Sequence, residues 1–164
     1  MPTQILDHQD ILYRTKRIAF QAAEAFAAEQ EIILAGISNS GYLFAQMLDK
    51  ELSDICDLKI SLCEVRMDKK KPLETIESSI SPDLFEGKNI ILCDDVLNSG
   101  TTLIYGVRYF LQVPLKKFKT AVLIDRNHKK YPVKADFKGI SLSTNLQEHI
   151  IVDLDGEYYS ASLS

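Results

Sequence analysis

The residues best suited to chemistry lie together between Asp94 and Thr102. Asp94 and Asp95 follow a run of apolar residues and precede a turn of small hydroxyl residues around Gly100. Two adjacent acids at the end of a buried strand cost desolvation free energy unless a partner satisfies them. A turn that opens a helix offers free backbone N–H groups, hydroxyls and a positive helix end, which together suit a phosphate. The segment therefore predicts a ligand that joins a phosphate to a diol, such as ribose 5-phosphate.

A second glycine-rich segment runs from Gly36 to Gly41 after another apolar run. Its Gly-x4-Gly spacing is that of a P-loop, but Tyr42 and Leu43 stand where a P-loop has Lys and Ser or Thr, which argues against a nucleotide triphosphatase. The alternative for this segment is a plain tight turn. The alternative for the first segment is that its hydroxyl residues are ordinary helix caps and its acids lie on a solvated loop.

The elements that must position these residues alternate between helical and strand periods. Helices are predicted over residues 7–30, after residue 41 and over 101–111; buried strands over 32–35, 58–62, 90–93 and 120–124; a long mobile loop over 66–81; and a hairpin with a tight turn over 150–161. This order requires crossover connections, so we expect one α/β domain with a mostly parallel sheet. In such sheets ligands bind beyond the carboxyl ends of the strands, where both glycine-rich segments fall.

Composition limits the classes of protein to consider. The chain has 164 residues with 46% hydrophobic and 26% charged positions, which predicts a single soluble domain over 1–164. Three cysteines without a CxxC pair, no leader and no long apolar segment favour a cytoplasmic protein with no membrane partner. The net charge of −4 argues against nucleic acid as a partner, yet residues 116–138 hold eight basic residues against two acidic ones. We expect this positive segment to cover an anionic substrate.

Residues 90–102, IILCDDVLNSGTT, resemble the phosphoribosyl-pyrophosphate (PRPP) signature of the type I phosphoribosyltransferases. The resemblance extends to residues 5–7, 17–19 and 125–139 and is closest to the PyrR family of pyrimidine-operon attenuators and uracil phosphoribosyltransferases. It implies the type I phosphoribosyltransferase fold, with a small hood mainly within 125–164. The implied activity is transfer of the 5-phosphoribosyl group from PRPP to a nucleobase, uracil first, with release of pyrophosphate in pyrimidine salvage.

The resemblance also implies roles for individual residues. Asp94 and Asp95 are the implied catalytic residues; Leu97, Asn98, Ser99, Gly100, Thr101 and Thr102 bind the 5-phosphate; Ser38, Asn39, Ser40, Gly41 and Arg66 bind pyrophosphate; and Arg126 and Phe137 bind the base. The implied cofactor is Mg²⁺, held mainly by PRPP and water, and the implied assembly is a homodimer.

Two positions depart from the patterns of the related enzymes. Ser40 stands where the PyrR family has an arginine in the pyrophosphate loop; because a charge-assisted hydrogen bond contributes about 1.5–3 kcal/mol, PRPP affinity or turnover should be lower here. Asn98 stands where purine-specific relatives commonly have an aspartate that accepts a proton. An amide cannot take that role, which favours a pyrimidine.

Two other functions compete with the transferase. One is an RNA-binding attenuator that senses nucleotides and has weak or vestigial transferase activity. The positive segment, Arg14, Lys16 and Arg17, and the absence of an arginine at the position of Ser40 favour it. The net negative charge of the chain argues against it. A receiver-like signalling domain also has paired acids at strand ends. A receiver-like domain would not explain the phosphate turn or the positive segment.

Overall fold

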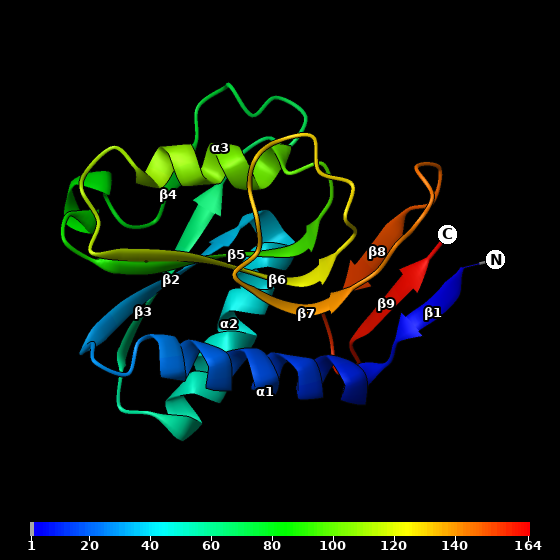
Figure 1. Cartoon of the computed structure of the whole chain (residues 1–164), viewed down its shortest axis with the longest axis horizontal. Coiled ribbons are helices and arrows are strands. Elements are labelled where there is room, and N and C mark those ends of the chain that lie inside the picture. The colour runs from blue at the N-terminus through cyan, green and yellow to red at the C-terminus, as the bar shows by residue number, and fades with distance from the viewer. Residues whose placement is uncertain (1) are drawn as a thin grey trace.

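The computed structural model describes residues 2–164 and gives the chain three helices and two sheets (Figure 1). In chain order the elements are β1 (Thr3–Leu6), α1 (His8–Ala25), β2 (Glu31–Ile37), α2 (Ser38–Ile55), β3 (Lys59–Arg66), β4 (Glu77–Ser78), a 3-10 turn (Pro82–Phe85), β5 (Asn89–Leu97), α3 (Thr101–Phe110), β6 (Lys117–Asp125), β7 (Phe137–Ser141), β8 (Ile150–Asp153) and β9 (Ser160–Leu163).

The larger sheet confirms the predicted parallel α/β architecture. Its order is β4-β3-β2-β5-β6-β7, with β4 antiparallel at the edge and the other neighbours parallel. The strand that carries the two acids, β5, therefore lies in the middle of the sheet. β7 was not predicted from the sequence, because its five residues include a glycine and a lysine and lack an apolar run.

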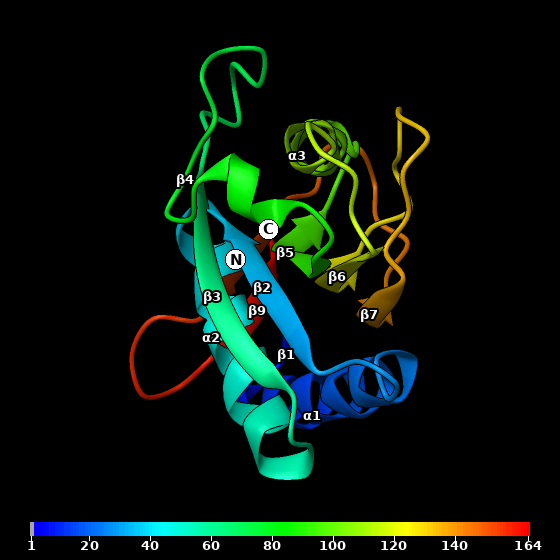
Figure 2. The ribbon, with the colours of Figure 1, turned by 90° about the vertical axis from the view of Figure 1, so that its left-hand side faces the viewer.

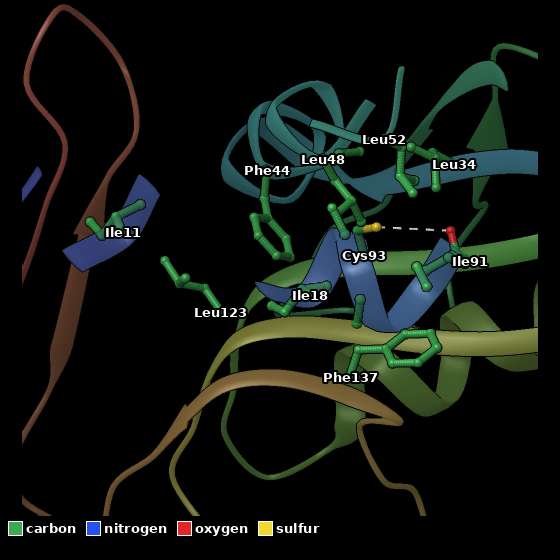
Figure 3. Packing of buried hydrophobic residues seen from close by; sticks show 14 of the residues in the cluster. Ile11, Ile18, Leu34, Phe44, Leu48, Leu52, Ile91, Cys93, Leu123 and Phe137 are labelled. Carbon is green, nitrogen blue, oxygen red and sulfur yellow. Dashed lines mark hydrogen bonds between the residues drawn. The ribbon is translucent and has the colours of Figure 1, made fainter. Parts of the chain in front are cut away.

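Helices cover both faces of this sheet. α1 and α2 lie on one face and α3 on the other, as the two views show (Figures 1 and 2). The side chains of β5 point alternately to the two faces of the sheet. Ile91 and Cys93 pack with α1 and α2, whereas Ile90 and Leu92 pack with α3. Figure 3 shows the first of these clusters. A strand buried on both sides explains the unbroken apolar run of the sequence.

The start of α1 follows its sequence signal closely. The Asp7 side chain accepts a hydrogen bond from the Asp10 amide (2.8 Å), and the Asp10 carboxylate accepts one from the Asp7 amide (3.0 Å). This capping box satisfies two of the helix's free N–H groups. On the helix surface, Arg14 and Arg17 donate to backbone oxygens of Gly139 (2.9 Å) and Lys138 (3.0 Å), which ties α1 to β7.

Three local predictions were wrong. Residues 38–41 are the first turn of α2, which follows β2 without a loop. Residues 66–81 include strand β4, whose Ser78 pairs with Val65, because β3 offers it a free edge. The C-terminal strands are joined by six residues rather than by a two-residue turn, since Asp153 pairs with Ser160.

The smaller sheet has the order β1-β9-β8, so the N-terminal strand joins the two C-terminal ones (Figure 1). Thr3 pairs with Leu163 and Ile150 also pairs with Leu163. This sheet brings the start of β8 close to the end of β5, although more than fifty residues separate them in the chain.

Candidate functional site

Asp94 and Asp95 lie inside β5, close to its carboxyl end. Asp94 is 2% exposed, and its Oδ1 accepts a hydrogen bond from the Asp95 amide at 2.9 Å. Asp95 Oδ1 accepts one from the Val96 amide, also at 2.9 Å. Both carboxylates are therefore held by the strand's own backbone, which fixes where their remaining oxygens point.

A lysine from the segment after β3 faces both acids. Lys69 Nζ lies 3.2 Å from Asp94 Oδ1 and 3.9 Å from Asp95 Oδ1. The sequence showed Lys69 only as part of a lysine run in a polar segment, and such runs are usually solvated. Sequence reasoning missed this ion pair because no local pattern says which lysine reaches β5.

Burial raises the pKa of Asp94 to about 8; the negative charge of Asp95 adds to the rise and Lys69 opposes it. Desolvation lowers the pKa of Lys69, but the charges of Asp94 and Asp95 outweigh it and leave the pKa above its ordinary value. At neutral pH the buried carboxyl is therefore mostly protonated, while the lysine stays charged.

The turn after β5 has the geometry of an anion site. Gly100 adopts a left-handed conformation (φ +90°), and a Cβ there would also lie 2.8 Å from Val133. Gly100 has no side chain to cap α3; the Thr101 amide donates to Ser99 Oγ (3.3 Å) and the Ile104 amide to the Gly100 oxygen (2.9 Å). Among residues 2–164 no acceptor is found for the amides of Thr102 and Leu103, and free amides at a helix start favour an anion.

These groups line one cavity of about 170 Å³. Its lining consists of Lys69, Asp94, Asp95, Val96, Leu97, Asn98, Ser99, Gly100, Thr101, Thr102, Leu103, Val122 and Ile150. The structure thus brings together every residue predicted for catalysis and for the 5-phosphate. It adds Lys69 and Ile150, which sequence reasoning did not assign.

The residues predicted for pyrophosphate do not line this cavity. Residues 38–41 form the first turn of α2, with Ser38 in a left-handed conformation (φ +54°) and its hydroxyl donating to the Met67 oxygen (3.3 Å). Gly41 packs so closely that a Cβ would lie 3.1 Å from Asp94 Oδ1. Arg66 is exposed at the end of β3, opposite Glu77 of β4. This side of the site adjoins Asp94 without joining the cavity.

Arg126 is 7% exposed, and its guanidinium donates hydrogen bonds to other groups of the protein. It donates to Thr144 Oγ1 (2.9 Å), Asn98 Oδ1 (3.0 Å), and the backbone oxygens of Asn145 (3.0 Å) and Glu148 (2.6 Å). These bonds tie the end of β6 to the turn after β5 and to the segment before β8. They leave Arg126 beside the cavity rather than in its wall.

Phe137 is not placed to stack on a base, so that expectation needs correction. The ring is 8% exposed and belongs to the hydrophobic cluster under α1, with Ile18 and Leu123 (Figure 3). It lies at the start of β7, level with Ala121 of β6 and Cys93 of β5, and its ring packs on the α1 face of the sheet. The apolar residues of the cavity wall are Val96, Leu97, Leu103, Val122 and Ile150, and Ile150 is the first residue of β8.

The basic segment 116–138 does not lie over the site as a whole. Lys116 and Lys117 are at the start of β6, where Lys116 pairs with Glu29 (2.6 Å) and Lys117 donates to the Ala25 oxygen (2.7 Å). Lys134 and Lys138 pair with acids of the same segment. The N-terminal end of β6 and its C-terminal end lie at opposite ends of the strands of the sheet. The basic residues of the segment are therefore divided between these two ends.

Comparison with known proteins decides the family. The family described as "Phosphoribosyl transferase domain" matches residues 2–156. The chain belongs to the phosphoribosyltransferase family. Relatives include a "Bifunctional protein pyrR" of Enterococcus faecalis, 31% identical over 93% of this chain and 89% of that one. A "Pyrimidine operon regulatory protein" of Lactococcus lactis is 29% identical over 92% and 89%.

Solved phosphoribosyltransferases share the fold. The hypoxanthine phosphoribosyltransferase of Trypanosoma cruzi superimposes with a TM-score of 0.78 at 16% identity, over 91% of this chain and 85% of that one. A hypoxanthine-guanine phosphoribosyltransferase of Bacillus anthracis gives 0.77 at 19% identity, over 98% and 96%. The predicted type I phosphoribosyltransferase fold is confirmed.

Two further features of this phosphoribosyltransferase bear on its chemistry. Cys56, Cys63 and Cys93 are free thiols, and burial raises the pKa of both Cys63 and Cys93. Within residues 2–164 no cluster of three His, Cys, Asp or Glu side chains could hold a metal ion, and no helix is long and apolar enough to cross a bilayer.

Proposed function

We propose that this phosphoribosyltransferase moves the 5-phosphoribosyl group of PRPP to uracil and releases pyrophosphate. The observation that carries the proposal is the shared cavity: two carboxylates on β5 and the open first turn of α3 line the same space of about 170 Å³. A phosphate and a neighbouring ribose diol are the groups that such a space suits.

The phosphate half of the site is built by the turn of residues 98–102. The residues of the first turn of α3 line the cavity, and the hydroxyls of Ser99 and Thr101 lie 2.8 Å apart. Each hydroxyl can rotate from its neighbour to a phosphate oxygen at little cost, since it exchanges one hydrogen bond for a charge-assisted one. Gly100 permits the turn that aims them.

The carboxylates of Asp94 and Asp95 act on the ribose. Each keeps oxygen lone pairs that can accept from the ribose hydroxyls once Lys69 moves away. As the bond from C1 to pyrophosphate breaks, positive charge develops on the sugar, and fixed carboxylates nearby stabilise it. Pyrophosphate leaves with the electron pair of the broken C1–O bond, and the base nitrogen forms the new bond to C1 and gives its proton to water.

Mg²⁺ fits this site as a partner of the substrate. Asp94 and Asp95 are oxygen ligands of the type that the ion prefers, and the ammonium of Lys69 already lies against both. Without a third acidic or histidine ligand in residues 2–164, the remaining ligands would be substrate oxygens and water. When bound, the ion neutralises charge on the pyrophosphate leaving group.

Uracil is proposed over a purine because of Asn98, which lines the cavity and cannot accept a proton through its amide. The names of the pyrimidine-operon relatives point the same way, whereas the superimposed hypoxanthine enzymes share only the fold. The decisive experiment measures pyrophosphate release from PRPP and Mg²⁺ with uracil, hypoxanthine, guanine, adenine and orotate. We expect turnover with uracil; PRPP binding without release with any base would contradict the transferase.

The second candidate is an RNA-binding regulator; the name of the Lactococcus relative supports a regulatory role. The structure weakens the part of the argument that relied on α1, because Arg14 and Arg17 donate to β7. Lys129 and Lys130 are exposed beside the site and remain available. Filter binding of uridine-rich and random RNA at low and high salt tests this candidate, and no binding at low salt would remove it.

A homodimer is proposed from the family resemblance. Sedimentation of the free protein, with and without PRPP, measures it directly. A single monomeric species under both conditions would contradict it.

A further inference from the structure

Arg126 holds together two segments that meet at the site. On one side its Nη1 donates to Asn98 in the turn after β5 (3.0 Å). On the other it donates to Thr144, Asn145 and Glu148, which lead into β8 and Ile150. Arg126 is 7% exposed and its guanidinium is hydrogen-bonded on both sides, which makes it a rigid link between the two segments. The planar guanidinium is pre-organised, so each hydrogen bond costs it little conformational entropy.

The contact between Arg126 and Asn98 fixes which way the amide of Asn98 faces. A guanidinium only donates hydrogen bonds, so the atom of Asn98 that faces it must be Oδ1. The opposite orientation would place an NH2 group against an N–H group. The Asn98 side chain is otherwise exposed and lines the cavity. Among residues 2–164 no acceptor takes its Nδ2, so the amide presents a donor to the space that the ligand enters.

We propose that Arg126 orients Asn98 so that its NH2 group donates to a carbonyl oxygen of the bound base, which makes Asn98 a selector of oxo-bases over amino-bases. The inference rests on the proposed function for the presence of a base. It reassigns both residues: Asn98 acts on the base rather than on the 5-phosphate, and Arg126 is a positioning residue. Ile150, across the same cavity, supplies the apolar contact for the ring.

The ratio of affinities for oxo- and amino-bases follows from the free energy of one hydrogen bond. A base with an exocyclic amine in place of the carbonyl puts a donor against a donor, and both groups then lose their hydrogen bonds to water. A neutral hydrogen bond contributes about 0.5–1.5 kcal/mol, so the oxo-base should bind roughly three- to tenfold more tightly through this contact. The phosphate half of the ligand is not involved.

The test measures equilibrium binding and needs no turnover. Calorimetry of the wild type should show that uridine monophosphate binds more tightly than both cytidine monophosphate and ribose 5-phosphate; inosine and adenosine monophosphates form a second oxo–amino pair. Asn98→Asp keeps an oxygen for Arg126 but replaces the NH2 group by an acceptor. We expect it to lower uridine monophosphate affinity at least about tenfold and to leave ribose 5-phosphate within about twofold.

Arg126→Lys tests the positioning role. It keeps the charge but loses the fork, so the preference for uridine over cytidine monophosphate should fall about three- to tenfold while ribose 5-phosphate binding stays unchanged. Thr144→Val is the matched control, because it removes one bond of Arg126 and spares the bond to Asn98. It should keep the wild-type preference.

Equal loss of nucleotide and ribose 5-phosphate binding in Asn98→Asp would place Asn98 on the phosphate and overturn the inference. So would a wild type that binds uridine monophosphate no more tightly than ribose 5-phosphate, or that prefers the amino nucleotide of both pairs. Failure of pyrophosphate release would instead count against the transferase, because these binding measurements contain no PRPP.

Discussion

Replacing Lys69 by Met removes the ammonium that faces Asp94 while it keeps most of the unbranched apolar side chain. Two unit charges at the observed 3.2 Å attract by roughly 5 kcal/mol at an effective dielectric constant of about 20. The net effect is smaller, since 41% of the lysine side chain is exposed and Asp94 can take a proton when the lysine is gone. We expect Lys69→Met to lower the free energy of unfolding by about 1–2 kcal/mol near pH 9, where Asp94 of the wild type is mostly ionised.

The loss should depend on pH because burial raises the pKa of Asp94 to about 8. Near pH 6 the carboxyl is mostly protonated in the native protein, so removing Lys69 changes little. Near pH 9 the wild type pairs an ionised Asp94 with the lysine, whereas the variant must keep the proton or bury an unpaired charge. Lys69→Met should therefore destabilise the protein more at the higher pH.

Urea denaturation at both pH values measures the difference. Lys70→Met is the matched control, because Lys70 is exposed and forms none of the ion pairs found among residues 2–164. It should be neutral at both. An equal loss for Lys69→Met at pH 6 and pH 9 would refute the reasoning, since it would mean that the lysine contributes packing alone.

Three other variants test single parts of the site. Asp94→Asn should become more stable relative to the wild type as the pH rises from about 4 to about 8, by at most about 1.4 kcal/mol per pH unit. The reason is that the raised pKa of Asp94 makes its ionisation unfavourable in the folded protein. A stability difference that does not vary with pH in thermal scans would contradict this. Asp95→Ala should lower pyrophosphate release at least about 100-fold with less than about 1 kcal/mol lost in stability, and retained activity would remove its role. Gly100→Ala should cost about 1–2 kcal/mol through its left-handed backbone, and ribose 5-phosphate binding, followed by calorimetry, should weaken with it.

The sequence predicted best what local patterns encode. The apolar run before Asp94 indicated a strand buried on both faces, and β5 has that place in the sheet. The starts of the helices after Asp7 and after Gly100 were also predicted correctly, because each depends on residues a few positions apart. The residues of the phosphate turn consequently meet in one cavity as expected.

What the sequence could not predict depends on contacts between distant segments. Lys69 reaches Asp94 across 25 positions and Arg126 reaches Asn98 across 28, and neither residue differs in type from its exposed neighbours. Phe137 was assigned to the base because the family resemblance implies a hood over the base in this part of the chain. Its side chain instead faces α1, since β7 is an edge strand with one face on that helix.

The three parts of the site differ in how far they are built before a ligand arrives. The phosphate turn is fixed by β5 and α3, and the base side is fixed by the bonds of Arg126. On the pyrophosphate side, Lys69 instead occupies both carboxylates, and it stands on residues 67–76, which form no helix or strand. A substrate that uses Asp94 must displace that lysine. Because the departing ammonium stays tethered beside the site, we propose that it meets the pyrophosphate in place of the arginine that the family resemblance implies at the position of Ser40.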